Sequence, residues 1–451
     1  MLKEKTYKGK WWLPNNQENQ VSGTLTILPE GDITLETIGE LGEISFLEIF
    51  ASDSPIQHNV IWGIDFDATP ISIFGCAAGM KQNTSSPFPL VNYKVQVIAL
   101  GAHIASLDEL GNYDIKVTIP ELSLWFRSNC LHSQTDGKDF AWFTNFKESN
   151  KLTIPIEDNC QLLLEGEINF NQSINGLNLN IEESTVLKFS FDKPISMQDA
   201  KKKVFQFEQF LSFATLSVVN CTHFWLIDKD KRKDSQNKCS IEIIDKRLPR
   251  KINTRFWEYL FVHETISKSF DKVIKKWYEE KDLYPIRAHL IDSISHKGYF
   301  ETNDFLVVCQ AIEGFYYRFR KQDGSLTAVI KELLTEFSDI KVLEISETDI
   351  KNIQDTRHHY THLLPTGKKK HVIDDAHELY NLNHNLRKLL ISCVLNLIGF
   401  TNPEINDIFE HSNNSYLRMT GKQKRTIIEE EPITLKGKIL SVTQSTEVEP
   451  E

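Results

Sequence analysis

Apolar and polar residues alternate along the first part of the chain. The run Val21–Leu28 has a period of two, and so does Ile33–Ile38, which follows the turn-forming residues Pro29–Asp32. Successive strand residues point to opposite faces of a sheet, so these two runs predict a β-hairpin. Similar runs, separated by Gly, Pro and Asn, occur at Ile44–Phe50, Val60–Phe66, Pro70–Cys76, Tyr93–Leu100, Tyr113–Ile119, Lys151–Pro155, Leu162–Phe170 and Thr185–Phe191. Residues 1–195 are therefore expected to form a β-rich domain, either sandwich-like or a rolled antiparallel sheet.

The spacing of apolar residues changes near Met197. From Met197 to Val219 they recur every three or four residues, which predicts a helix with one apolar stripe. Two strand-like runs follow, Cys221–Ile227 and Cys239–Ile244, with a charged loop between them. We expect residues 196–250 to close the first domain or to connect it with the next.

Residues 251–420 have the spacing of helices. The predicted segments are Thr254–Ser267, Ser269–Glu280, an irregular piece at Leu283–Ser295, Thr302–Lys321, Thr327–Phe337, Thr348–Leu364 and Asp375–Ile398. Gly399 suits a helix C-terminus, and Pro365 ends the preceding helix because the residue before proline avoids the α region. The charged residues 421–451, with one strand-like run at Ile433–Val442, are typical of a disordered tail. The expected fold class is α+β, with an all-α bundle after the β-rich domain.

The composition is that of an ordinary soluble protein. The chain has 451 residues, enough for two or three domains, with 40% hydrophobic and 25% charged residues. No secretory signal follows Met1, and no stretch reaches the roughly 18 apolar residues needed to cross a bilayer, so we expect a cytoplasmic protein without membrane contact. Seven scattered cysteines without a C-x-x-C pair predict buried free thiols and no zinc site. No cofactor is expected.

The net charge of −11 excludes a general polyanion-binding protein, so RNA binding would need a local basic patch. Lys368, Lys369 and Lys370 could follow an RNA backbone or form a solvated loop. A second basic stretch has the same two interpretations, and it consists of Lys246, Arg247, Arg250, Lys251 and Arg255.

The strongest candidate for chemistry is the segment Asp355–His362, which reads DTRHHYTH. Histidine exchanges protons near neutral pH, and arginine binds phosphate oxygens as a fork. Together they suit RNA cleavage without a metal, in which the ribose 2′-hydroxyl attacks the phosphorus. The products would carry a 2′,3′-cyclic phosphate and a 5′-hydroxyl.

The spacing of an arginine, four residues and a histidine is weak by itself, because it recurs at Arg127–His132. On a helix, Arg357 and His362 would lie about 140° apart and would not share a face. They can converge if the helix ends or distorts near Pro365, or with copies from a second subunit across a two-fold axis. The alternative interpretation is a polar helix end with solvated histidines.

A family resemblance adds context. The opening residues Tyr7–Asn15, followed by Val21–Leu25, resemble the start of the ApeA-type N-terminal domain. The second half resembles the HEPN domain that accompanies it: Phe305–Arg320 is similar to the long helix before the motif, and Asp375–Ile398 to the last helix. Arg357 to His362 falls on the family's Arg-x4-His motif. The resemblance covers nearly the whole chain except the tail.

The resemblance implies a function and a set of roles. HEPN nucleases are metal-independent RNases that usually form dimers with a composite site, and ApeA-like proteins cut host RNA, with tRNA as one candidate, in abortive infection after phage attack. The N-terminal domain would then sense a phage-derived trigger or regulate the nuclease. Arg357 would bind phosphate, His362 would be the acid/base, and His358 would orient the site. The roles of His359 and Tyr360 stay open.

Two rival functions remain. A non-catalytic HEPN-type domain that binds nucleotides, RNA or partners fits the negative charge, whereas three histidines within six positions favour the nuclease. A carbohydrate-binding or hydrolytic role of the β domain is the weaker rival. Trp11 and Trp12 could form a stacking platform, but neighbours on a strand face opposite sides, so one is expected in the core. Glu313 and Arg318 could support the site in trans or be exposed charges.

Overall fold

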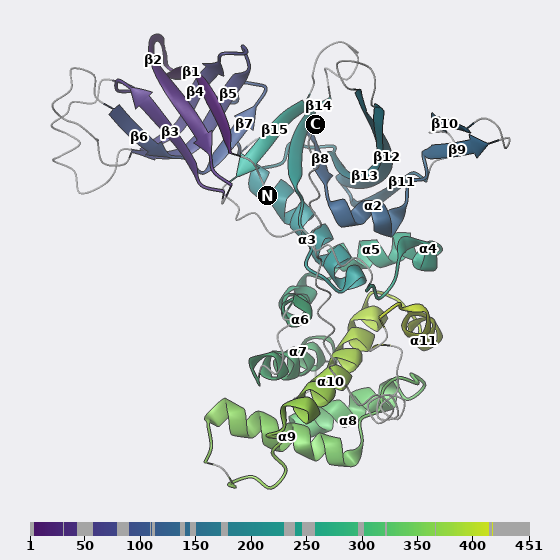
Figure 1. The fold of residues 1–451 in the computed structure, drawn as a ribbon. Coiled ribbons are helices and arrows are strands. Elements are labelled where there is room, and N and C mark those ends of the chain that lie inside the picture. Colours follow the sequence, from purple (N-terminus) through teal and green to yellow (C-terminus); the bar gives the residue numbers. More distant parts are fainter. Residues whose placement is uncertain are drawn as a thin grey trace, which may run out of the picture.

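The computed structural model of this chain describes residues 4–29, 31–42, 57–78, 90–108, 110, 113–135, 140–144, 150–172, 179–229, 240–245, 258–295, 302–320, 323–365, 367–414 and 417. A β-rich N-terminal region is followed by a helical C-terminal region, so the α+β prediction is confirmed (Figure 1). The predicted strand Ile44–Phe50, the basic stretch at 246–255 and the tail with its run at 433–442 lie outside the described residues.

The first six strands close into an antiparallel barrel. They are β1 (Lys5–Leu13), β2 (Asn16–Ile27), β3 (Ile33–Ile38), β4 (Gln57–Asp65), β5 (Pro70–Ala78) and β6 (Leu90–Lys94). The neighbours run in the order β4, β1, β2, β3, β6, and the pairing of β6 with β5 completes the ring. Of the two arrangements that the strand pattern left open, the rolled sheet is the one found in this part of the chain.

Trp11 occupies the centre of the barrel and is fully buried. It pairs with Gly63 across β1 and β4, and a Cβ atom at Gly63 would lie 2.2 Å from the Trp11 ring. Only glycine leaves the space that this ring fills. Trp12 is also buried, on the other face of β1, where its ring contacts His103 edge-on at 5.3 Å. Neither tryptophan is available as a stacking platform.

The same hydrogen-bonded sheet continues from the barrel through β7 (Val97–Leu100), which pairs with both β5 and β15. The part of it beyond the barrel is called the second sheet below. The strand order then runs β15, β14, β8, β13, β12, β11. The bounds are β8 (Tyr113–Thr118), β11 (Leu152–Glu157), β12 (Cys160–Gln172), β13 (Leu179–Phe191), β14 (His223–Asp228) and β15 (Ser240–Asp245). A separate hairpin of β9 (Leu131–Thr135) and β10 (Phe140–Thr144) projects beside this sheet (Figure 1).

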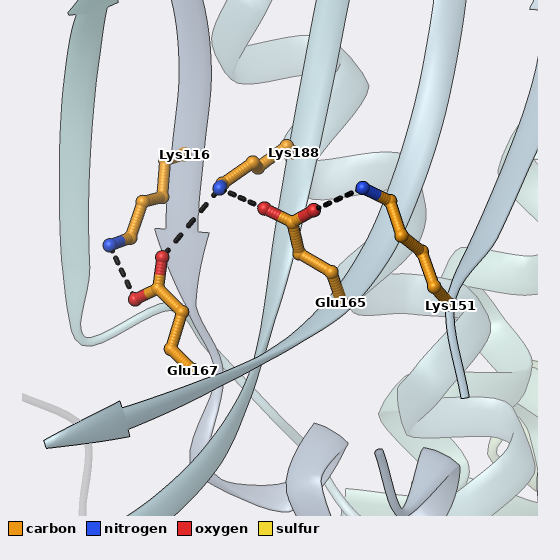
Figure 2. A network of polar contacts seen from close by, with 5 residues as sticks. All are labelled: Lys116, Lys151, Glu165, Glu167 and Lys188. Carbon is orange, nitrogen blue, oxygen red and sulfur yellow. Dashed lines mark hydrogen bonds and ion pairs between the residues drawn. The ribbon is translucent and has the colours of Figure 1, made fainter. Parts of the chain in front are cut away.

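One face of the second sheet carries alternating charges. Lys116 Nζ lies 2.6 Å from Glu167, Lys188 bonds Glu165 and lies 3.6 Å from Glu167, and Lys151 lies 3.1 Å from Glu165 (Figure 2). The residues between them point to the other face, which is apolar and buried and includes Ile115, Val117, Leu162, Leu164, Leu187 and Phe189. This alternation of charged and apolar positions produces the period of two that the sequence shows in these strands.

The apolar face of the second sheet and the C-terminal helices share one continuous core. Two helices lie among the strands, α2 (Pro120–Phe126) and α3 (Met197–Thr215). The C-terminal helices are α4 (His263–Ile266), α5 (Phe270–Glu279), α6 (Tyr284–Ser295), α7 (Thr302–Arg320), α8 (Leu326–Glu336), α9 (Glu347–His362), α10 (Ala376–Leu397) and α11 (Asn402–His411). Between sheet and bundle, Trp277 donates to the carbonyl of Gln206 on α3 at 2.9 Å, and Tyr278 donates to that of Lys203 at 2.9 Å. Helix α3 therefore connects the two regions.

Two helix predictions differ from the structure, and one helix of the structure has no counterpart among the predictions. The predicted helix Thr254–Ser267 is wrong over residues 258–262, where the amide of Leu260 donates to the carbonyl of Ala214 instead of bonding along a helix. Helix α3 stops at Thr215, before the predicted Val219, because Leu216 adopts the left-handed conformation. Helix α11 was not predicted, although the capping pair Thr401 and Glu404 marks its start.

Six cysteines lie in the described part of the chain. All are free thiols, and five of them are buried: Cys76, Cys130, Cys160, Cys309 and Cys393. The prediction of buried free thiols is confirmed for these five.

Among the helices that the structure describes, none is long and apolar enough to cross a membrane.

Candidate active site

The motif lies in the last two turns of α9. The helix begins with a capping box, in which Ser346 accepts from the amide of Asp349 and the Asp349 carboxylate accepts from the amide of Ser346. Ile350 and Ile353 bury one face of the helix in the core. The helix ends at His362, because Leu363 adopts the left-handed conformation with φ of 48°. Local chemistry therefore fixes both ends of the helix that carries the motif.

Arg357 forms an ion pair with a neighbouring helix. Its Nη2 donates to Oε2 of Glu313 on α7 at 2.9 Å. The two side chains are 32% and 28% exposed, so the pair sits at the surface but is partly shielded from water. Glu313 thus contacts the motif arginine of its own chain, whereas Arg318 forms an ion pair with Asp282 at 3.7 Å.

His358 and His362 lie side by side, one helical turn apart. Their ring centroids are 4.7 Å apart, with the ring planes inclined at 59°. Partial desolvation lowers the pKa of His358, and the positive charges of Lys369, His362 and Arg357 lower it further, against a smaller opposing effect of Asp355. The His358 imidazole is therefore biased towards its neutral form near physiological pH.

The segment after α9 folds back along the helix. The amide of Ile373 donates to Oγ1 of Thr356 at 3.0 Å, and the amide of His371 donates to Asp355 at 3.3 Å. Tyr360 donates its hydroxyl to the carbonyl of Ile373 at 3.4 Å. These contacts assign Tyr360 a structural role, which the sequence left open.

The returning segment brings only one of the three predicted lysines to the motif. Lys369 Nζ lies 3.6 Å from Asp355, and its charge acts on His358. Lys368 and Lys370 are exposed to solvent. The charges of Arg357 and Lys369 therefore both act on His358, whose ring lies beside that of His362, and each of the two cations has one carboxylate partner.

Arg357 and His362 do not converge within the chain. The helix continues through His362, so no distortion towards Pro365 turns the two side chains onto one face. Residues five apart on such a helix stay about 140° apart. The second Arg-x4-His spacing has no helix at all, because Arg127 follows the end of α2 and His132 lies in β9.

Two polar side-chain atoms between Arg357 and His362 are buried without a hydrogen-bond partner among the described residues. They are Nδ1 of His358 and Nδ1 of His359. The ring of His359 packs edge-on against Tyr360 at 5.0 Å. Within the described residues, no group of three or more His, Cys, Asp or Glu side chains could hold a metal ion.

Two protein-family models match this chain. A family model described as ApeA N-terminal domain 1 matches residues 6–277, which is more than half of the chain. A second model, described as Apea-like HEPN, matches residues 306–404 and so includes α9 with its motif. Comparisons with curated proteins and with solved structures found no match.

The two matches carry general expectations about function. HEPN domains are in general RNases, and they often act on RNA and often form dimers. The pairing of the two domains supports a HEPN nuclease role in abortive infection. The order of a β-rich region and a helical region agrees with the order of the two matches. The chain therefore belongs to the ApeA family, with an ApeA N-terminal domain followed by an Apea-like HEPN domain.

Proposed function

We propose that this chain is a metal-independent endoribonuclease that cuts host RNA in the cytoplasm during phage infection, with tRNA as the first candidate. The observation that carries the proposal is the cluster at the end of α9, where the rings of His358 and His362 lie side by side and the charges of Arg357 and Lys369 act on His358. The N-terminal region would sense the phage-derived trigger and restrain or license cleavage.

The chemistry follows from the properties of each side chain. His362 is exposed and would take the proton of the ribose 2′-hydroxyl or give one to the leaving 5′-oxygen. Attack by the 2′-oxygen breaks the bond from phosphorus to the 5′-oxygen and leaves a 2′,3′-cyclic phosphate. Arg357 would stabilise the charge on the phosphate oxygens, with Lys369 as an additional cation. Neutral His358 would orient the ring of His362.

A second subunit would complete this site. Because Arg357 and His362 lie on different faces of α9, a two-fold axis beside the helix end would bring Arg357 of one subunit towards His362 of the partner subunit. Leu363, at the end of α9, is 85% exposed, and Tyr317 on α7 is 65% exposed. Burial of such apolar side chains between subunits would favour a homodimer.

Mixing two inactive variants tests the shared site. Arg357→Ala and His362→Ala proteins are purified separately, unfolded and refolded together. If each site uses residues of both subunits, half of the dimers regain one of two sites, so about a quarter of the wild-type cleavage returns. Cleavage that stays absent in the mixture, while the dimer forms, would contradict the shared site.

The cleavage itself is tested with total tRNA and EDTA. Wild-type protein is expected to give fragments with 2′,3′-cyclic phosphate ends, while His362→Ala and Arg357→Ala give none. Cleavage that survives in both variants would exclude the assigned site. When all samples leave RNA intact, the reaction is repeated in extract from infected cells, which supplies the trigger.

The net charge of −11 favours a second candidate function, a HEPN-type domain that binds RNA or nucleotides without cutting. Expression in a bacterial host separates the two. A nuclease is expected to be toxic once triggered, with the toxicity relieved by His362→Ala. A binding protein would retain its RNA affinity and its effect on growth in that variant.

A further inference from the structure

Glu313 is the one acidic side chain that hydrogen-bonds the motif arginine in the described part of the chain. It lies 44 residues before Arg357, on α7, and the 2.9 Å bond joins two neighbouring helices. The backbone at each end of the bond is held by the core: Ile312 and Phe315 are buried beside Glu313, and Ile353 and Thr356 are buried on the turn before Arg357. The pair is therefore anchored, unlike the flexible ion pairs of an open surface.

The geometry of the bond matters for what the arginine can do. Only Nη2 is engaged, and no other hydrogen bond of the guanidinium is found within the described residues. The Nε and Nη1 hydrogens are left for two phosphate oxygens. A carboxylate that filled the anion site itself would instead take two parallel donors of the fork. The single contact thus favours a carboxylate that orients Arg357 over a carboxylate that occupies the anion site of Arg357.

We propose that Glu313 is a positioning residue: its carboxylate holds the Arg357 guanidinium by Nη2 in the orientation that presents the remaining donors to the RNA phosphate. This inference rests on the proposed nuclease function. Without Glu313, the long arginine side chain samples several rotamers, and only a fraction of them places the charge where it develops during the reaction. The effect should therefore fall on the rate of the bound complex more than on RNA affinity.

The test compares three single substitutions. Glu313→Ala removes the bond, and Glu313→Gln keeps an oxygen acceptor without the charge. Glu336→Ala is the matched control, because Glu336 forms an ion pair with Arg320 at the end of α7 with similar exposure, 35% and 26%, but does not contact the motif. Each protein is measured for Tm, for kcat and KM of RNA cleavage, and for RNA affinity in a His362→Ala background.

The expected result separates positioning from stability. Glu313→Ala should lower kcat about 10- to 100-fold, with KM and RNA affinity changed by no more than about threefold. Glu313→Gln should recover most of the lost rate, because its amide oxygen still accepts from Nη2. Glu336→Ala should share the shift in Tm and leave kcat unchanged. Faster cleavage by Glu313→Ala would identify a block, and an unchanged kcat would identify a bystander; either result overturns the inference.

A second readout does not depend on activity. The ¹⁵N–¹H signal of Arg357 Nε reports how ordered its side chain is, and it is assigned by its loss in Arg357→Ala. We expect an ordered signal in wild type and in Glu336→Ala, and an averaged one in Glu313→Ala. An equally ordered signal in Glu313→Ala rejects the positioning role even if no RNA is cut. Cleavage abolished by Arg357→Ala but unaffected by Glu313→Ala would reject this inference alone and leave the nuclease proposal intact.

Discussion

At the scale of single residues, the two cations that act on His358 each pair with a carboxylate from a different segment of the chain. Glu313 on α7 binds Arg357, and Asp355 on α9 binds Lys369 of the returning segment. His358 lies among these charges, and partial desolvation together with the nearby cations lowers its pKa. The His358 imidazole is thus biased towards its neutral form next to the ring of His362, which suits it to accept or relay a hydrogen bond.

Removal of one of these cations should raise the pKa of His358. In Lys369→Gln, a like charge disappears, so the protonated imidazole becomes easier to form, while the effect of desolvation remains. A titration of His358 followed by NMR should show an upward shift that does not fully reach the ordinary histidine value. Lys370→Gln, which alters an exposed neighbour, is the control and should leave the titration unchanged. A downward shift in Lys369→Gln would contradict this account of the site.

At the scale of elements, the residues at the two ends of α9 determine where the helix that carries the motif begins and ends. Its predicted bounds, Thr348–Leu364, lie close to the observed Glu347–His362. The capping box at Ser346 starts the helix and the left-handed Leu363 ends it. Because the helix starts after the cap at Ser346, Arg357 and His358 lie in its last two turns.

Loss of the cap should weaken this helix without touching the motif. Ser346→Ala removes the acceptor for the amide of Asp349, and the free energy of unfolding should fall by about 1 kcal/mol. Ser346→Thr keeps the side-chain oxygen and should retain most of the stability. Urea unfolding followed by circular dichroism measures both variants. Equal stability of Ser346→Ala and wild type would mean that packing of Ile350 and Ile353 alone fixes the helix start.

At the scale of the whole molecule, the described residues pack around two apolar cores. One fills the barrel around Trp11, and the other runs from the second sheet through α3 into the helical region. Strand β7 hydrogen-bonds to β5 of the barrel and to β15 of the second sheet. Backbone hydrogen bonds therefore connect the barrel with the second sheet, although their apolar cores are separate. The trigger-sensing role proposed for the N-terminal region would need this connection to transmit a change.

The two cores should respond separately to substitution. Gly63→Ala places a Cβ atom 2.2 Å from the Trp11 ring and should increase hydrogen exchange in the barrel strands, with α7 to α10 still protected. Phe210→Ala empties a fully buried site on α3 and should cost about 3–5 kcal/mol, with exchange rising in both the second sheet and the helices. Exchange measured by mass spectrometry resolves these regions. Equal loss of protection in α7 to α10 for both variants would mean that the molecule unfolds as one unit.

The sequence by itself determined the type of most elements and the location of the motif. A period of two or of 3.6 residues arises from the local backbone, so runs such as Ile33–Ile38 and Asp375–Ile398 were readable without knowledge of their neighbours. Residues 258–262 are not helical although their pattern predicts a helix, because the amides of Leu260 and Phe261 bond to the distant carbonyl of Ala214, which no local pattern reports.

Only the tertiary structure decided which elements meet. The closure of the barrel by β5 and β6 depends on pairing between strands, and an alternating pattern is the same whichever strand lies beside it. The contact of Glu313 with Arg357 joins two helices across 44 residues of sequence. The chain has 62 acidic residues, and the sequence around Glu313 does not indicate that this one pairs with Arg357. Periodicity records which face of an element is buried, whereas the packing of those faces sets which side chains share a site.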